Sequence, residues 1–446
     1  MLNNRLLTLL ESIRTSFWFI PSTMVCCAAL LAHAFLAFDH YGDGSDLEAL
    51  AFLYQTSAES ARSILSTIAT SMMTVTSIAF SITVVALTLA SSQFGPRLIR
   101  NFMSDKGTQF TLGAFVSIYI YCILVLQATQ STDSQSFIPG ASVFFAVALA
   151  FFGVAILIYF IHHVAQAIQA DNVVDRVYCE LQNNINRLFP DDDEPSAGKA
   201  HTLEADDFSV QKQILAPQDG YLQALDADGL CKFARQNDVK IVVLRMAGDF
   251  VIKHSPIMYV HYKSGQSNNH ELPFEISECL SFITIGAKRT PIQDPEFAIH
   301  QLVEVAVRAL SPGINDPYTA MTCVDKLSAI LCQLTHRPFP PHLHYDDKHC
   351  VRLETKQITF DCLAESAFNQ IRQYGQSSVA VTIRLIESLA NIARASQDQA
   401  QRDFVDKQIT MLAQTNNQLA LPRYDKEAIE QGIEQVKGCL ANFKQN

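Results

Sequence analysis

The chain has 446 residues, of which 49% are hydrophobic and only 17% carry a charge, whereas soluble domains average about 25% charged residues. This composition excludes a single water-soluble globule and favours a membrane part joined to a soluble part. The 33 Lys and Arg against 44 Asp and Glu give a formal net charge of −11, which argues against binding of nucleic acid through its phosphates. We therefore expect a lipid bilayer, and no nucleic acid, among the partners.

Four segments are long and apolar enough to cross a hydrocarbon core of about 30 Å as helices, which takes about 20 residues each. None of them contains Asp, Glu, Lys or Arg; they are Phe19–Phe38, Ile64–Ala90, Phe110–Ala128 and Ala141–Ile161. The first is longer than the apolar region of a secretory signal peptide, which has about 7–15 residues. We therefore interpret it as a membrane anchor.

The flanks of these segments predict their orientation, because cytoplasmic loops collect Lys and Arg. On one side lie Arg5, Arg14, Arg97, Arg100, Lys106, Arg176 and Arg187. On the other side lie Arg62 and the acidic residues Asp39, Asp43, Asp46, Glu48 and Glu59. Both termini are therefore expected in the cytoplasm, and Trp18, the only tryptophan, is expected at the headgroup level.

The second apolar segment belongs to a longer helix. Thr56-x-x-Glu59 predicts a capping box and Gly95-Pro96 a stop. One helix is therefore expected from about Ser57 to Gln93, roughly 55 Å long and longer than the membrane core.

One face of this helix carries a line of hydroxyl groups, which we call the hydroxyl stripe. With 100° per residue and the first member as zero, all members lie within about 40° of one line; they are Ser63, Thr67, Thr70, Thr74, Ser77, Ser81, Thr88 and Ser92. Thr76 and Thr83 fall on the far side. An uncharged polar line among apolar residues is expected to face protein or water rather than lipid.

Two interpretations of the hydroxyl stripe stay open. Small residues let helices approach closely, which would make the stripe a packing seam. Alternatively, the stripe lines a water-filled path to which each subunit of a closed ring contributes one helix. Four spans are too few to enclose a wide path, so this interpretation implies a homo-oligomer, and Phe80 and Phe94 become candidates for an apolar constriction.

His162 and His163 end the fourth segment. Histidine titrates near neutral pH, which allows a pH switch, but two histidines at the end of a span are more often interfacial residues. We expect the interfacial role.

The chain after residue 165, the end of the predicted transmembrane domain, is expected to form three parts. Residues 166–199 predict a helical connector with an acidic linker at Pro190–Gly198, residues 200–289 a small β-rich domain, and residues 290–446 a helical cytoplasmic domain. The expected strands are Ser209–Leu215, Tyr221–Leu225, Lys240–Arg245, Phe250–Ile252, Pro256–Tyr262 and Cys279–Ile285. The phrases Gly220–Ala224 and Val243–Ile257 resemble half of a biotinyl/lipoyl-type barrel-sandwich. The lysine-bearing hairpin tip of carrier domains is missing, so a small structural barrel is the expectation.

The helical part has two similar helix starts, Asp294-Pro295 and Asp316-Pro317. In each, Asp can cap the helix while Pro occupies the first turn. Further helices are expected near 360–374, 379–395, 398–414 and 426–443. One Pro-rich loop collects the potential metal ligands His336, His342, His344, Asp346, Asp347 and His349. Their spacing matches no compact site, so we expect no metal and no cofactor.

Five stretches resemble a bacterial family of predicted integral membrane proteins, domain of unknown function 2254. They are Ser16-Phe-Trp-Phe-Ile-Pro21, the run from Ser77 to Phe102, Tyr159-Phe-Ile-His-His163, Asp294-Pro-Glu-Phe-Ala-Ile299 and Ser311-Pro-Gly-Ile-Asn-Asp-Pro317. The resemblance implies a multi-pass protein of the bacterial inner membrane and supplies no activity. The residues themselves favour a homo-oligomeric channel for small ions, lined by the hydroxyl stripe, with a cytoplasmic vestibule or sensor.

The alternative is a membrane-anchored scaffold or regulatory protein without transport. An enzyme is not expected, because the predicted spans contain no Asp, Glu, Lys or Arg and the chain lacks a nucleophile elbow, a P-loop and an H-E-x-x-H motif.

Overall fold

The computed structural model describes residues 18–41, 57–98, 102–103, 105–129, 131–132, 135–136, 139–191, 210–263 and 272–442. Residues used above that lie outside these ranges are Arg5, Arg14, Ser16, Asp43, Asp46, Glu48, Thr56, Arg100 and Ser209, together with most of the predicted acidic linker. The chain divides into two compact units, Met1–Val173 and Val174–Asn446. The finer division at residues 165, 199 and 289 stays a prediction.

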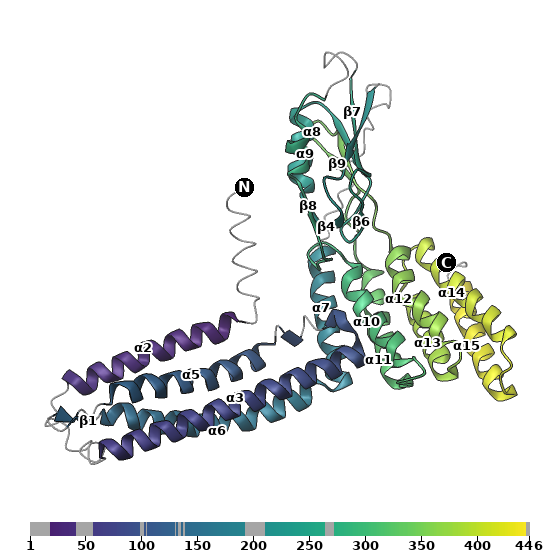
Figure 1. Ribbon diagram of the computed structural model, residues 1–446. Coiled ribbons are helices and arrows are strands. Elements are labelled where there is room, and N and C mark those ends of the chain that lie inside the picture. The colour runs from purple at the N-terminus through teal and green to yellow at the C-terminus, as the bar shows by residue number, and fades with distance from the viewer. Residues whose placement is uncertain are drawn as a thin grey trace. The chain divides into compact units, whose positions relative to one another are not determined.

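The described residues of the first unit contain four helices long and apolar enough to cross a membrane (Figure 1). They are α2 (Phe19–Tyr41), α3 (Ala58–Phe94), α5 (Lys106–Ala128) and α6 (Gly140–Ala167). Each contains one of the four predicted segments. A short 3-10 turn, η2 (Pro96–Leu98), follows α3, and β1 (Ser131–Thr132) pairs with β2 (Gln135–Ser136) between α5 and α6.

Helix α3 starts one residue later than the capping box predicts. Ser57 is the N-cap, and its hydroxyl accepts a hydrogen bond from Ser60 N at 3.2 Å. At the other end, Gly95 has φ 113° and its N–H donates to Ser91 O, a conformation that glycine adopts without steric cost. The predicted stop is therefore confirmed, and the cap is Ser57 rather than Thr56.

Helix α5 forms the core of this unit, and α2, α3 and α6 pack around it. Phe115 and Tyr121 of α5 are fully buried. Small residues bring the helices close: a Cβ at Gly113 would lie 3.0 Å from Pro21 Cα of α2. Asp39 at the end of α2 accepts hydrogen bonds from Ser142 N and Ser142 Oγ, at 3.0 and 2.6 Å, and so satisfies free N–H groups at the start of α6.

The described part of the second unit contains two sheets. The larger has the strand order β3 (Val210–Leu215), β7 (Pro256–Tyr262), β5 (Lys240–Val243), β10 (Val351–Glu354) and β9 (Leu343–Tyr345). The smaller has the order β6 (Phe250–Val251), β4 (Gly220–Leu225) and β8 (Ile283–Gly286). Both sheets are open at their edges in the described part of the chain, so the expected small barrel is not confirmed.

Two short helices depart from the predicted all-strand pattern. Helix α8 (Ala227–Gln236) follows β4 and is absent from the prediction, and α9 (Ile276–Leu280) occupies the start of the predicted strand Cys279–Ile285. That expectation is wrong at its first four residues, because Cys279 and Leu280 belong to α9 and the strand begins only at Ile283.

The largest difference from the sequence-based prediction lies at the end of the predicted Pro-rich loop and just after it. The loop was expected from His336 to His349 within a helical region, but Leu343–Tyr345 forms β9 and Val351–Glu354 forms β10, which pairs in parallel with β5, Leu353 opposite Ile241. Leu353 is fully buried in the sheet core beside Ile241 and Val260. The β-rich part is therefore completed by a strand that follows two helices in the chain.

The remaining helices are α7 (Ala170–Leu188), α10 (Glu296–Ala309), α11 (Pro317–Leu334), α12 (Phe360–Gly375), α13 (Val379–Ala395), α14 (Gln399–Gln418) and α15 (Arg423–Asn442). They belong to the second unit, except that α7 begins just before it, and α10, α11 and α13 each pack against the next helix but one: α12, α13 and α15. Asp316 caps α11 by accepting a hydrogen bond from Thr319 N at 3.1 Å, with Pro317 in the first turn. This predicted helix start is confirmed.

Candidate functional site

The hydroxyl stripe lies on the outer face of α3. All eight of its residues are exposed. The buried residues of α3 lie within about 60° of the opposite direction; they are Ala61, Leu65, Ala69, Met72, Thr76, Ala79, Ala90 and Phe94. In the described part of the first unit, the stripe is therefore not a seam between helices of the same chain. A seam with another molecule and a water-lined face both stay open.

The hydroxyl hydrogens of the stripe are used within α3. Six of them donate to carbonyl oxygens three or four residues earlier, at distances of 2.7–3.0 Å, from Thr67, Thr74, Ser77, Ser81, Thr88 and Ser92. Such back-bonding lowers the cost of placing a hydroxyl away from water. The oxygen lone pairs still point outward, so the stripe can accept hydrogen bonds from water or a hydrated ion.

The outer faces of α3 and α6 differ in polarity. The exposed residues of α6 within the apolar segment lack charge and most are large and hydrophobic, including Phe144, Phe151, Phe152, Val154 and Ile158. The outer face of α3 instead carries the hydroxyl stripe beside exposed hydrophobic residues such as Met73, Ile78, Val84 and Leu89. Only α6 presents a face that suits lipid along its whole length.

The two phenylalanines proposed for a constriction differ in their exposure. Phe80 is 40% exposed, whereas Phe94 is 6% exposed. Phe94 is buried on the side of α3 that lies about 140° from the stripe. The expectation for Phe94 is therefore wrong, and Phe80 remains a candidate together with the exposed Ile, Val and Leu positions of α3.

One charged residue at the start of the stripe was missed. Glu59 is exposed and lies four residues before Ser63, about 40° from it on the helix. The helical arithmetic that found the stripe also finds Glu59, but the prediction considered hydroxyl groups alone. The stripe therefore begins with a carboxylate at the N-terminal end of α3.

A groove of about 490 Å³ runs beside the stripe between α3 and α6. Ser63, Thr67 and Ser71 of α3 form its polar wall, and Phe151 and Val154 belong to the α6 wall. Two members of the hydroxyl stripe therefore border this groove.

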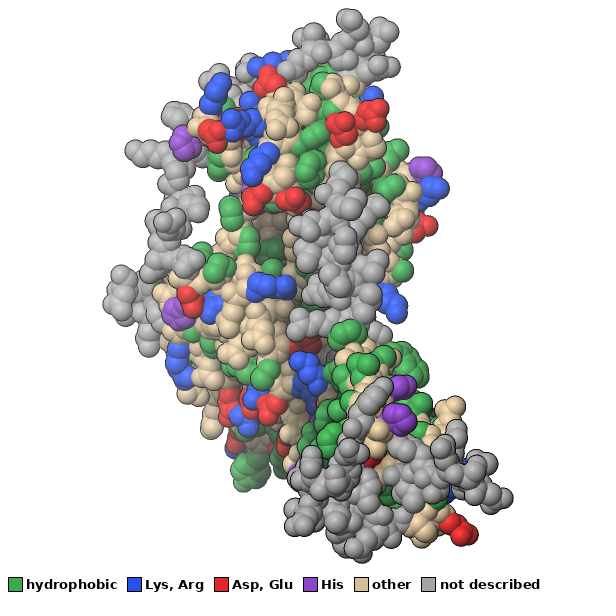
Figure 2. Space-filling view, turned by 90° about the vertical axis from the view of Figure 1, so that its left-hand side faces the viewer, with side chains coloured by type: hydrophobic (Ala, Val, Ile, Leu, Met, Phe, Trp, Pro, Cys, Tyr) green, Lys and Arg blue, Asp and Glu red, His purple; other side chains and the backbone are tan. Residues whose placement is uncertain are grey.

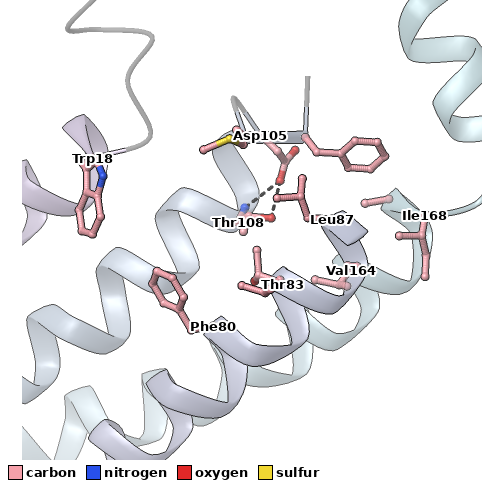
Figure 3. A pocket seen from close by; sticks show the side chains of 13 residues that line it. Trp18, Phe80, Thr83, Leu87, Asp105, Thr108, Val164 and Ile168 are labelled. Carbon is pink, nitrogen blue, oxygen red and sulfur yellow. Dashed lines mark hydrogen bonds between the residues drawn. The ribbon is translucent and has the colours of Figure 1, made fainter. Parts of the chain in front are cut away.

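A second pocket, of about 250 Å³, lies where α3 and α6 end and α5 begins (Figure 3). Its walls are mostly apolar and come from four parts of the first unit; the lining residues are Trp18, Phe80, Thr83, Val84, Ala86, Leu87, Phe102, Met103, Asp105, Thr108, Val164, Ala167 and Ile168. Asp105 is the one charged residue in this lining. We call it the Asp105 pocket.

Asp105 is the N-cap of α5 and is also paired with α6. Its Oδ2 accepts hydrogen bonds from Thr108 N at 2.9 Å and Thr108 Oγ1 at 2.8 Å, and lies 2.6 Å from His163 Nε2. Burial raises the pKa of Asp105, but the hydrogen bonds from His163 and Thr108 outweigh burial and hold this pKa below its usual value. The carboxylate is therefore ionised near neutral pH, and His163 Nε2 donates to it.

The two adjacent histidines thus have different surroundings. His162 is exposed, whereas His163 joins α6 to Asp105 and stacks on Tyr159 with ring centroids 5.4 Å apart. A Cβ at Gly107 would lie 2.5 Å from His163 Nε2, so the glycine leaves room for the imidazole.

The second unit gives its charged clusters structural roles. Asp346 accepts hydrogen bonds from Lys348 N, Cys350 N and Arg352 Nε at 2.8–3.0 Å. Asp294 accepts from Arg289 Nε at 2.7 Å and from Glu296 N at 3.1 Å. Among the described residues, no group of three or more His, Cys, Asp or Glu is placed to hold a metal ion.

The surface of the β-rich part carries both signs of charge. At the top of the view in Figure 2, basic and acidic side chains are interspersed. One example is the ion pair between Lys240 Nζ and Glu354 Oε2 at 2.9 Å. A mixed surface of this kind creates no extended field of one sign on that face.

Comparisons with known proteins place these features in a family context. The sequence profile described as "Predicted membrane protein (DUF2254)" matches residues 14–391. Uncharacterized proteins of Mycobacterium tuberculosis and Mycobacterium bovis are 30% identical over 410 residues, which cover 92% of this chain and 78% of each relative. No solved structure matches the chain.

Proposed function

Because the chain belongs to the DUF2254 family of predicted membrane proteins, we propose that it is a homo-oligomeric channel for small ions. In this proposal, several copies form a ring in the bacterial inner membrane, and α3 of each copy presents its hydroxyl stripe to a shared axis. Both termini face the cytoplasm, and the second unit acts as a vestibule or sensor. The channel carries out no enzymatic reaction.

The observation that carries this proposal is the position of the stripe opposite the buried face of α3. The stripe is exposed along its whole length, from Ser63 to Ser92, while the outer face of α6 is apolar. In an isolated unit the hydroxyl oxygens would face hydrocarbon, where no donor is available. Polar groups without a partner in hydrocarbon cost free energy. In a ring with α3 toward the axis and α6 toward the outside, the hydroxyl stripe contacts water and the apolar face of α6 contacts lipid.

The packing of one unit explains why a ring is needed. The middle of α5 fills the centre of the four helices, and Phe115, Tyr121, Cys122 and Val125 are fully buried there. An ion path through this close-packed core would require its side chains to leave. A path between copies, along the outer face of α3, requires no such change.

Ion flux through liposomes tests the proposal. The variants Thr74→Leu and Ser81→Leu replace hydroxyl groups in the middle of the stripe by larger apolar side chains, whereas the control Ala155→Leu changes an exposed position of α6. We expect wild type and the control to conduct under a cation or an anion gradient, and the two stripe variants to lose most of the flux. Equal flux in all four proteins would contradict a path along the stripe.

A second candidate function has its own support. The back-bonded hydroxyls of the stripe tolerate a dry environment, which also suits a packing seam between copies of a membrane-anchored scaffold or regulatory protein. In that case Thr74→Cys would form disulfide-linked dimers, while wild type would carry no flux in either gradient.

A further inference from the structure

The Asp105 pocket has features of a ligand site that the channel proposal does not use. It is bounded by the ends of α3 and α6 and by the start of α5. Leu87 of α3 and Val164 of α6 line the same space as Asp105 (Figure 3). A space of about 250 Å³ is far larger than one water molecule needs, and its apolar walls do not suit several.

The single charge in this lining decides the chemistry of the occupant. The Asp105 side chain is 15% exposed, and all its hydrogen bonds from described residues fall on Oδ2. Oδ1 therefore has capacity for another donor. Thr108 and His163 occupy Oδ2, so the carboxylate presents Oδ1 to a space with apolar walls. A carboxylate in such a place is stabilised by a cation.

The surroundings identify the cation as the head group of a lipid. The pocket opens at the end of helices that are long and apolar enough to cross a membrane, and Trp18, a residue type of the headgroup level, lines it. Lys106, the residue after Asp105, is exposed and supplies a positive charge for a phosphate. The apolar walls match a hydrocarbon chain.

We propose that the Asp105 pocket binds one membrane lipid with a zwitterionic ammonium phosphate head group, phosphatidylethanolamine being the simplest. The ammonium group donates to Asp105 Oδ1, and the phosphate lies near Lys106. The first part of an acyl chain lies against Leu87 and Val164. This binding involves a single subunit, so it does not depend on the channel proposal.

The only tryptophan of the chain lines this pocket and reports on its occupant. We would reconstitute the full-length protein in phosphatidylcholine nanodiscs and titrate phosphatidylethanolamine or phosphatidylglycerol with brominated acyl chains, which quench indole fluorescence on contact. For wild type we expect Trp18 to be half-quenched at a roughly tenfold lower fraction of the brominated phosphatidylethanolamine, a difference of about 1.4 kcal/mol.

Two variants and one control separate pocket binding from general lipid contact. Asp105→Asn removes the charge but preserves the helix cap, because Asn caps as well as Asp; it should abolish the preference between the two lipids. Ala167→Phe fills the pocket and should leave only the weak quenching of bulk lipid. Ala148→Phe, at an exposed position of the same helix, should behave as wild type.

Either of two results would overturn the proposal. One is equal quenching of wild type by the two lipids, or stronger quenching by phosphatidylglycerol. The other is a phosphatidylethanolamine preference that persists in Asp105→Asn or in Ala167→Phe. Neither result bears on ion flux, so the channel proposal can fail or stand separately.

Discussion

Replacement of Arg352 by Leu should lower the stability of β10 against local opening; β10 is the strand that we did not predict from the sequence. Arg352 lies on β10, and its guanidinium makes 2.8 Å contacts with Asp346 Oδ2 and Asp238 Oδ1. The Asp346 side chain is 3% exposed and the Asp238 side chain is 46% exposed. The two contacts therefore differ greatly in the free energy that their loss costs.

The expected loss of free energy follows from the two carboxylates that lose their partner when Arg352 is replaced. The pair with Asp238 contributes about 0–1 kcal/mol, as exposed ion pairs do. Without Arg352, Asp346 keeps two hydrogen bonds on Oδ1, from Lys348 N and Cys350 N, but Oδ2 loses its partner in a buried place. Breaking a buried pair costs about 3–5 kcal/mol, and the two surviving hydrogen bonds place the total near the lower limit, about 3 kcal/mol.

Amide hydrogen exchange of β10 in the full-length protein measures this loss. If local opening limits exchange, a loss of about 3 kcal/mol raises the exchange rate about a hundredfold. The variant Asp346→Asn and the double variant Arg352→Leu/Asp346→Asn complete a double-mutant cycle. Because the double variant leaves no buried charge, we expect its loss of stability to be smaller than the sum of the losses in the two single variants. A rate increase below about threefold in Arg352→Leu, or strictly additive effects, would refute the reasoning.

The pH dependence gives an independent check. Burial raises the pKa of Asp346, but hydrogen bonds from Arg352 and from the backbone N–H groups of Cys350 and Lys348 lower it below the usual value. A carboxyl group with a lowered folded pKa stabilises the fold above its unfolded pKa of about 3.9, and this stabilisation is lost as the pH falls through the folded value. Protection of wild-type β10 should therefore fall below about pH 4, and Arg352→Leu should show a weaker dependence.

Three further predictions concern other parts of the chain. Cysteine scanning along α3, read by a water-soluble maleimide in membranes, should label the hydroxyl stripe with helical periodicity, and uniform labelling would exclude a wet face. Gly113→Ala should lower the free energy of unfolding by about 1–3 kcal/mol, because its Cβ would lie 3.0 Å from Pro21 Cα. The control Gly438→Ala, whose Cβ meets no atom within 4 Å, should be neutral or stabilising. Burial and the nearby Glu296 raise the pKa of Cys362 to about 11, so iodoacetamide at pH 8 should modify it more slowly than the exposed Cys179; equal rates by peptide mass spectrometry would contradict this.

Local patterns in the sequence were sufficient for most helices. The predicted helix Val379–Ala395 has the predicted bounds, and α11 starts at Pro317 after the Asp316 cap. These features depend on residues close in the chain, through helical periodicity and capping. The same arithmetic located the hydroxyl stripe on one face of α3, but it could not tell which face of α3 the neighbouring helices cover.

The positions that the sequence misassigned depend on partners far away in the chain. Phe94 was grouped with Phe80 by residue type, and the folded chain shows that Phe94 is buried whereas Phe80 is exposed. The pairing of Asp105 with His163 joins the starts and ends of different helices, and each residue alone is compatible with a solvated helix end. Tertiary contacts therefore decided the candidate ligand site.

The sequence by itself determined that this protein has four apolar helices, a hydroxyl-lined second helix and a mixed second part, because hydrophobic length and period are local properties. Only the tertiary structure decided that the stripe faces outward and that β10 completes the sheet beside β5. Val351–Glu354 has only four residues, two of them charged, and is too short to be recognised alone. Its strand conformation is stabilised by hydrogen bonds to β5 and by burial of Leu353, and both depend on a chain closure that no local pattern encodes.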